Sequence, residues 1–209
     1  MEQQHAMHMG WGRFAAMVVT SSLIMFFLMY QLVYSWDHAL FSLTRLVSSI
    51  VMGCVMTAVM LAFMWKMYQP QAAKIIVLAA SIFGGVSLLA INRGQSLVGD
   101  TDFMKAMIPH HSIAINNARK ADIRDPRVRY LADRITRDQV KEIAEMKLLL
   151  QDIERHGRRS DRPLPAGPAE MRPEDEAEAR DLLSGRLLPS SISVTGTGAS
   201  SIQRHPARH

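Results

Sequence analysis

The sequence is poor in cysteine and, over three long stretches, entirely without charge. Cys54 is the single cysteine, so an intrachain disulfide is excluded. Asp, Glu, Lys and Arg are all absent from 14–36, 46–65 and 75–92. A helix of roughly 20 apolar residues crosses the hydrocarbon layer of a membrane and satisfies its own backbone hydrogen bonds there. The three stretches therefore predict three transmembrane helices.

The flanks of these stretches favour membrane insertion over burial in a soluble core, which would need polar helices to cover it. Trp11, Trp36 and Trp65 lie where aromatic residues gather at membrane interfaces. The transmembrane region is then 14–93, after an N-terminal segment, 1–13. Lys and Arg are in slight excess on the N-terminal side, which favours a cytoplasmic N-terminus and an exported C-terminal half. We expect a multi-pass protein of a bacterial inner membrane with a periplasmic domain.

The sequence also lacks the marks of several function classes. It contains no P-loop, no dinucleotide-binding fingerprint and no nucleophile–base pair, so we expect no enzyme. One basic cluster is present, without interleaved aromatic residues: Arg155, Arg158, Arg159 and Arg162. Such a cluster is more typical of a solvated linker than of a nucleic-acid site, so we expect no nucleic-acid partner.

Two helical patterns follow the membrane region. The first predicts a helix from about 100 to 119, with Pro109 inside it as a kink. In the second, Asp125 is a good N-cap, Pro126 suits the first helical position and Gly157 lies just past the end. Because the connection is short, the two helices should form an antiparallel hairpin.

The predicted fold is therefore all-α, with three transmembrane helices, a helical-hairpin domain at 94–157 and a tail. The tail, 158–209, is rich in Pro, Gly, Ser and charge, and we expect it to be flexible and polar. A short helix between Pro173 and Leu183 is the one element that its pattern allows.

Polar residues occupy the inner stripe of the hairpin, where apolar side chains are expected. His111 stands at a core position of the first helix, and Gln139 and Glu142 stand in the stripe of the second. A buried polar group costs free energy unless it finds a partner. If the hairpin closes near residue 122, His111 lies near Ile135, with the methionines of the first helix near Gln139 and Glu142. A hydrogen-bonded polar lock without metal is one interpretation of this stripe.

A soft-metal site is the other interpretation. Three methionines and two histidines converge on the same seam: Met104, Met107, Met146, His110 and His111. Thioethers are soft ligands and imidazole is borderline, a combination that suits Cu(I) or Ag(I) better than Zn²⁺ or Mg²⁺. A single methionine at such a position is more often packing, so spacing alone leaves both interpretations open.

The residues on this seam also form a recognisable pattern. They are Asp102-Phe103-Met104 and Met107-Ile108-Pro109-His110-His111, followed by Gln139, Glu142-Ile143 and Met146. This FMxxMIPHH…QxxEIxxM pattern resembles the signature of the domain of unknown function numbered 305, over roughly 99–151. The resemblance implies a ferritin-like helical bundle, usually exported, whose better-understood relatives bind copper and silver through Met and His.

The resemblance also implies a set of ligands. The candidates are Met104, Met107, His110, His111 and Met146, with Gln139 and Glu142 as supporting or additional ligands. Where the family commonly has a further Met, this sequence has Asn117, which removes one soft ligand. A single hairpin buries little apolar surface, so a homo-oligomer is expected.

The sequence thus predicts a membrane-anchored protein that binds copper or silver for buffering, chaperoning or resistance. The alternative is a structural or oligomerisation module with a His/Gln/Glu hydrogen-bonded core. A third interpretation, a metal path through the membrane, depends on methionines four residues apart in the second membrane stretch: Met52, Met56, Met60 and Met64. Packing is the better explanation of that stripe, because Met fills space readily in apolar helices.

Overall fold

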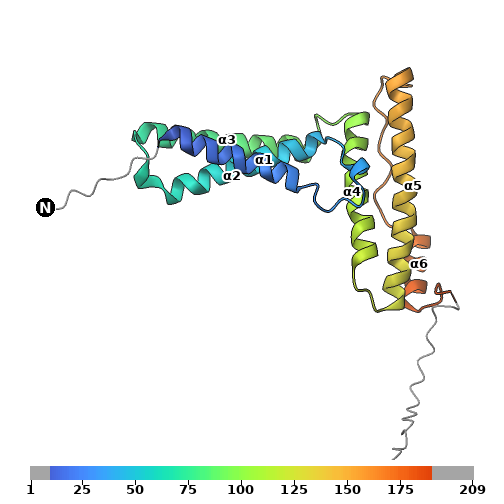
Figure 1. Cartoon of the computed structure of the whole chain (residues 1–209). Coiled ribbons are helices and arrows are strands. Elements are labelled where there is room, and N and C mark those ends of the chain that lie inside the picture. Colours follow the sequence, from blue (N-terminus) through green and yellow to red (C-terminus); the bar gives the residue numbers. More distant parts are fainter. Residues whose placement is uncertain (1–9, 190–209) are drawn as a thin grey trace, which may run out of the picture.

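The computed structural model describes residues 10–189 of the 209-residue chain, and all its regular elements in that part are helical. Figure 1 shows two assemblies. The helices α1, α2 and α3 run side by side in one bundle, and a long hairpin of α4 and α5 lies across the end of that bundle. Helix α4 lies between the bundle and α5. The predicted all-α fold is confirmed.

The bundle consists of α1 (Trp11–Leu28), α2 (Leu43–Phe63) and α3 (Gln71–Gly94). All three are long and apolar enough to cross a membrane. Large apolar side chains point outward from them: Phe63 is 89% exposed and Phe83 is 77% exposed. Helices that face lipid present such apolar outer surfaces. The prediction of three helices of this kind is confirmed.

The first helix is shorter than predicted. It ends at Leu28 rather than at residue 36, and the chain then turns into a short 3-10 helix, η1 (Trp36–His38). Tyr30 lies in this turn and is buried, and its hydroxyl accepts the Ser42 backbone N–H at 3.1 Å. A run without charge therefore did not fix where this helix ends, because uncharged polar residues can also build a folded loop.

The other two helices begin earlier than predicted, since each holds a cation in its first turns. Arg45 of α2 lies with its guanidinium carbon 4.4 Å from the centre of the Tyr30 ring. Lys74 of α3 is buried at the opposite end of the bundle, donates to the Trp65 carbonyl at 3.1 Å and lies over the Trp65 ring. Both cations thus have aromatic partners at the ends of the apolar segments.

Small residues let the three helices approach closely. A Cβ at Gly53 of α2 would lie 2.5 Å from the Ser22 hydroxyl oxygen of α1. A Cβ at Gly85 of α3 would lie 3.1 Å from the Cys54 Cβ of α2. Close packing through small residues is the usual way in which apolar helices associate in lipid.

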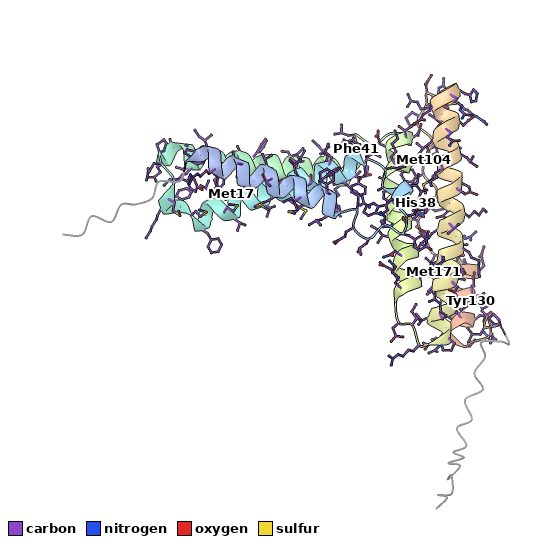
Figure 2. The ribbon with its side chains drawn as sticks, in the orientation of Figure 1. Met17, His38, Phe41, Met104, Tyr130 and Met171 are labelled. Atoms are coloured by element: carbon purple, nitrogen blue, oxygen red, sulfur yellow. The ribbon has the colours of Figure 1, made fainter. Side chains whose placement is uncertain are left out.

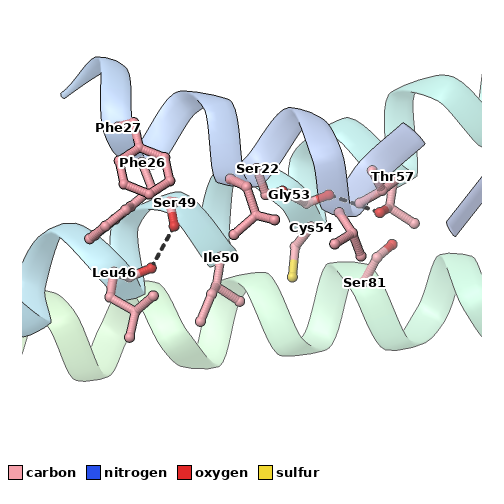
Figure 3. Close-up of a pocket in the computed structure, with 13 residues that line it drawn as sticks. Ser22, Phe26, Phe27, Leu46, Ser49, Ile50, Gly53, Cys54, Thr57 and Ser81 are labelled. Carbon is pink, nitrogen blue, oxygen red and sulfur yellow. Dashed lines mark hydrogen bonds between the residues drawn. The ribbon is translucent and has the colours of Figure 1, made fainter. Parts of the chain in front are cut away.

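A groove of about 450 Å³ lies on the surface where α1 meets α2 (Figure 3). Two of its hydroxyl groups are satisfied within α2, because Ser49 donates to the Leu46 carbonyl at 2.9 Å and Thr57 donates to the Gly53 carbonyl at 2.8 Å. A third, that of Ser81, donates within α3 to the Leu78 carbonyl at 2.9 Å. The groove is therefore apolar in character, although several of its residues are polar.

The methionines of α2 do not form one continuous buried row. Met60 and Met64 pack against a buried cluster of Phe14, Leu61 and Tyr68, whereas Met52 is 43% exposed. This arrangement is what space-filling methionines adopt.

The hairpin consists of α4 (Asp100–Lys120) and α5 (Pro126–His156), joined by a short connection. The Asp125 side chain accepts the Arg127 backbone N–H at 2.8 Å and so caps α5. Gly157 follows α5 with a φ of 77°, a value that favours glycine. The predicted hairpin and its end signals are confirmed.

A further helix, α6 (Pro173–Leu183), lies within the predicted tail, 158–209, at the place that the sequence pattern allowed. It lies beside the first half of α5 (Figure 1), where Arg134 of α5 pairs with Glu178 of α6. The last part of that predicted tail, 190–209, falls outside the described residues, as does the start of the chain, 1–9.

Candidate metal centre in the hairpin seam

The seam between α4 and α5 is closed by one apolar cluster. Its buried members are Met104, Ile108, Ile115, Ile143, Met146 and Leu150, with Leu40, Met107 and Ile153 packed against them. Met104 is 5% exposed and Met146 is 9% exposed. Three thioethers from the predicted ligand set therefore share one nearly dry environment.

His111 brings an imidazole to the same seam. Its side chain is 11% exposed, and its Nε2 lies 2.7 Å from Oε2 of Glu142 on α5. The Glu142 side chain is 49% exposed, so its carboxylate lies at the boundary between the seam and the solvent. The contact thus joins a buried ring to a half-exposed acid across the two helices.

The residue count and the polar-lock interpretation predicted different neighbours for His111, and the structure agrees with the polar lock. We expected His111 to lie near Ile135, but it contacts Glu142, and Ile135 is 37% exposed. Helical side chains lean toward the N-terminus of their own helix. In an antiparallel pair, His111 therefore leans away from the connection and Glu142 leans toward it. The two side chains meet although the Glu142 backbone lies further from the connection.

The hydrogen bonds of His111 assign its tautomer. Nδ1 lies 2.8 Å from the backbone carbonyl oxygen of Met107, one turn earlier in α4. A carbonyl only accepts, so Nδ1 carries a proton and donates it. Nε2 then faces a carboxylate, which also accepts when it is ionised. Two acceptors repel each other at this distance, so the contact requires either a second proton on the pair or a bound cation between the two groups.

A metal-ligating histidine commonly has this arrangement, in which the nitrogen that does not bind metal donates to a backbone carbonyl. The carbonyl of Met107 fixes the His111 ring so that Nε2 is the free nitrogen of the neutral form. The same residue supplies both the orienting carbonyl and, through its side chain, a thioether packed at the seam.

Two predicted ligands lie less centrally. His110 is exposed, and the centre of its ring lies 6.0 Å from the centre of the His111 ring. Gln139 is half-buried on α5. Asn117, which replaces the additional methionine of the family pattern, is exposed on α4. A methionine at this position would therefore point away from the buried thioethers of the seam.

Between residues 10 and 189, no group of three or more His, Cys, Asp or Glu side chains lies close enough together to hold a metal ion. A site made of hard or borderline ligands, such as a zinc or di-iron centre, has no donor set there. An ion at the seam would depend on the thioethers together with His111.

Sequence analysis did not predict that the α1–α2 loop docks on the hairpin. Ser112, next to His111, is fully buried, and its hydroxyl oxygen accepts the Tyr34 backbone N–H at 2.8 Å. The same hydroxyl is hydrogen-bonded to Nδ1 of His38 at 3.0 Å. Figure 2 shows His38 beside α4. Leu40 of the same loop packs against the seam cluster.

An ion pair extends this docking to α5. Asp37 lies 2.5 Å from Nζ of Lys147, and Lys147 together with Ser35 lowers the pKa of Asp37 to about 2. Burial, with the positive charge of Lys147 nearby, lowers the pKa of His38. The only sequence signal was an Asp-His pair in a short loop between two apolar stretches, which does not by itself identify a binding partner.

Comparison with known proteins finds one relative of uncharacterised activity. The "Uncharacterized protein L153" of Acanthamoeba polyphaga mimivirus is 39% identical over 62 residues, which are 29% of this chain and 41% of that protein. The chain thus covers less than half of the length of this relative. No solved structure matches.

A family model matches from the first residue of α4 past the end of α6, beyond the predicted domain end at residue 157. Residues 100–188 are a domain of the family described as "Domain of unknown function (DUF305)".

Proposed function

We propose that this chain is a membrane-anchored protein that binds Cu(I) or Ag(I) in the seam between α4 and α5. The observation that carries the proposal is a buried imidazole, that of His111, on the helix seam whose apolar cluster contains three methionines. Its Nδ1 donates to the Met107 carbonyl, and its Nε2, which carries no proton in this tautomer of the neutral ring, faces the Glu142 carboxylate at the seam. Met104 and Met146 are buried in the same cluster.

The donor chemistry supports a soft, monovalent ion. Thioethers and a neutral imidazole match Cu(I) and Ag(I) in softness, and they require no carboxylate cluster. A site with little solvent suits a singly charged ion, because it costs less to desolvate than a divalent one. Glu142 would balance the charge of the ion, since its half-exposed carboxylate lies against Nε2 of His111.

A second candidate function is supported by the same contact. In a metal-free lock, His111 and Glu142 form a charged hydrogen bond that holds the hairpin in register, and the methionines serve only as packing. The 2.7 Å distance between Nε2 and Oε2 favours this lock when no ion is bound. The two functions are compatible in one molecule, since an ion at Nε2 would replace the proton of the lock.

The setting suggests storage or transfer of the ion without catalysis. Three apolar helices anchor the domain, and the slight excess of Lys and Arg on the N-terminal side supports an orientation in which the hairpin lies outside the cytoplasm, as in the periplasm of a bacterium. Apolar residues remain exposed on α5, among them Val140, Leu148 and Leu149. They support pairing of the hairpin with a second copy, as in a ferritin-like bundle.

The test is a Cu(I) competition titration on the full chain in detergent, against a chromogenic chelator. We expect tight binding that falls at least about tenfold, roughly 1.4 kcal/mol, in His111→Ala, because the only buried imidazole of the seam is lost. Leucine at Met104, Met107 and Met146 together should weaken binding further while it preserves packing volume.

His110→Ala is the matched control, since that ring is exposed, and it should retain most of the affinity. Equal losses in His110→Ala and His111→Ala would place the ion outside the seam. Failure of the folded wild-type chain to compete for Cu(I) or Ag(I) would leave the metal-free lock as the function of the contact.

A further inference from the structure

The geometry points to a docking surface for anionic phospholipid headgroups on the underside of α4. The apolar helices α1 to α3 end where the hairpin crosses them, and α4 is the hairpin helix on that side (Figure 1). In a membrane that these helices span, α4 would lie along the bilayer surface. This inference requires the membrane anchor but no bound metal.

Contacts with the α1–α2 loop identify the face of α4 that points toward the membrane. Ser112 binds the Tyr34 backbone and His38 of that loop. Arg119, two turns further along α4, lies with its guanidinium carbon 5.3 Å from the centre of the Tyr34 ring. Residues seven apart share a helix face, so Ser112 and Arg119 both lie on the underside.

Two cations lie at the C-terminal end of α4, one of them, Arg119, on the side that meets the loop. Arg119 and Lys120 are both exposed, and neither forms an ion pair within residues 10–189. The stretch 103–121 contains Lys and Arg but no Asp or Glu. Anionic lipid headgroups attract Lys and Arg near the surface, whereas zwitterionic headgroups do so weakly. The charge of this segment therefore matches an anionic leaflet.

Exposed aromatic residues also indicate that this side of α4 lies at the membrane surface. Trp36 is 80% exposed and Tyr34 is 44% exposed, and both belong to the loop that meets the underside. Exposed Trp and Tyr at the end of apolar helices are typical of the headgroup level. Arg119 stacks on one of these rings, which places its guanidinium at the same depth.

A simpler role for Arg119 and Lys120 is to compensate the dipole at the C-terminus of α4. That role does not depend on the lipid. Changing the charge of the lipid headgroups therefore distinguishes the two roles, because only lipid docking responds to it.

The experiment uses the full chain with Cys54→Ala and a fluorescent label on Ala121→Cys, an exposed residue just after α4. The protein is placed in nanodiscs of phosphatidylcholine, or of phosphatidylcholine with an equal amount of phosphatidylglycerol. Both contain a lipid with a quencher on its headgroup. We expect stronger quenching in the anionic discs, reduced by added salt.

The double variant Arg119→Gln/Lys120→Gln should lower the quenching in anionic discs toward the phosphatidylcholine level. The ratio of docked to undocked hairpin is expected to fall about fivefold for each charge removed. Arg155→Gln/Arg158→Gln, which removes two charges at the far end of α5, should leave quenching unchanged. Equal quenching of the unaltered hairpin in the two kinds of disc would overturn the proposal, as would a folded double variant that quenches like the parent.

Discussion

Nε2 of His111 lies 2.7 Å from Oε2 of Glu142, and this contact joins two helices whose contacting residues are 31 positions apart in the sequence. Because Nδ1 already donates to a carbonyl, the contact needs a second proton or a cation. This geometry fits a metal-free lock, and under our proposal a soft ion would replace the proton of that lock.

Removing the carboxylate should weaken the hairpin when no metal is present. Glu142→Ala is expected to lower the free energy of unfolding by about 1 kcal/mol, less than for a buried charged hydrogen bond because the acid is half-exposed. Thermal unfolding of the full chain in detergent measures the change. Glu145→Ala is the control, since Glu145 forms only an exposed pair with Lys141 at 3.7 Å. Equal destabilisation by both substitutions would argue against the lock.

Restoring the methionine of the family pattern should not improve the site. Asn117 is exposed on α4, away from the buried thioethers, so Asn117→Met is expected to leave the Cu(I) dissociation constant within about twofold of the parent value. The competition titration described above measures it. A tenfold gain in affinity would mean that the ion lies outside the seam.

Close packing of α1 on α2 makes Gly53 sensitive to substitution. Gly53→Ala would bring its Cβ to 2.5 Å from the Ser22 hydroxyl and should destabilise the bundle by about 1 kcal/mol. Ser22→Ala in the same chain should recover most of that loss, because it removes the clashing oxygen. Gly84→Ala, where a Cβ meets nothing within 4 Å, should be neutral or stabilising. Thermal unfolding in detergent compares them, and similar effects at both glycines would contradict the packing described.

Docking of the α1–α2 loop should weaken in mild acid. The pKa of His38 is lowered in the folded chain, so the docked state prefers the neutral ring. Its contribution is fully present above the unfolded pKa of about 6.5 and is lost as pH falls through the folded pKa. Asp37, with a pKa of about 2, stays ionised over this range.

Hydrogen exchange of the Tyr34 amide, which donates to Ser112, reports this docking. Its protection factor should fall between about pH 7.5 and about pH 5 in the parent chain. His38→Gln, which keeps a hydrogen-bonding side chain without the titration, should show a much smaller fall. A parent protection factor that is constant over this range would show that His38 does not control docking.

The helices could be predicted from the sequence because their signals are local. Runs without charge marked α1 to α3, and the cap at Asp125 and Gly157 marked both ends of α5. The run up to residue 36 overstated α1, since Tyr30 turns inward to bind Ser42. Composition shows which segments are apolar, but it does not show at which residue a helix ends.

The candidate site was predicted in part. Periodicity placed Met104, Met107, Met146 and His111 on the seam. The structure packs the three methionines in one cluster, and His111 joins them through its hydrogen bond to the Met107 carbonyl. The residue count placed Ile135 beside His111, whereas the structure joins His111 to Glu142, the partner that the polar-lock interpretation allowed. The opposite lean of side chains on antiparallel helices does not appear in a residue count. The docking of His38 on Ser112 is a contact between distant segments and leaves no periodic signal.

X-ray absorption at the copper edge, on the full chain loaded with Cu(I) and freed of excess metal, tests the central claim most directly. The account predicts a coordination shell of sulfur with one imidazole, and loss of the imidazole signal in His111→Ala but not in His110→Ala. A shell of nitrogen and oxygen alone, or a folded chain that retains no copper, would contradict it.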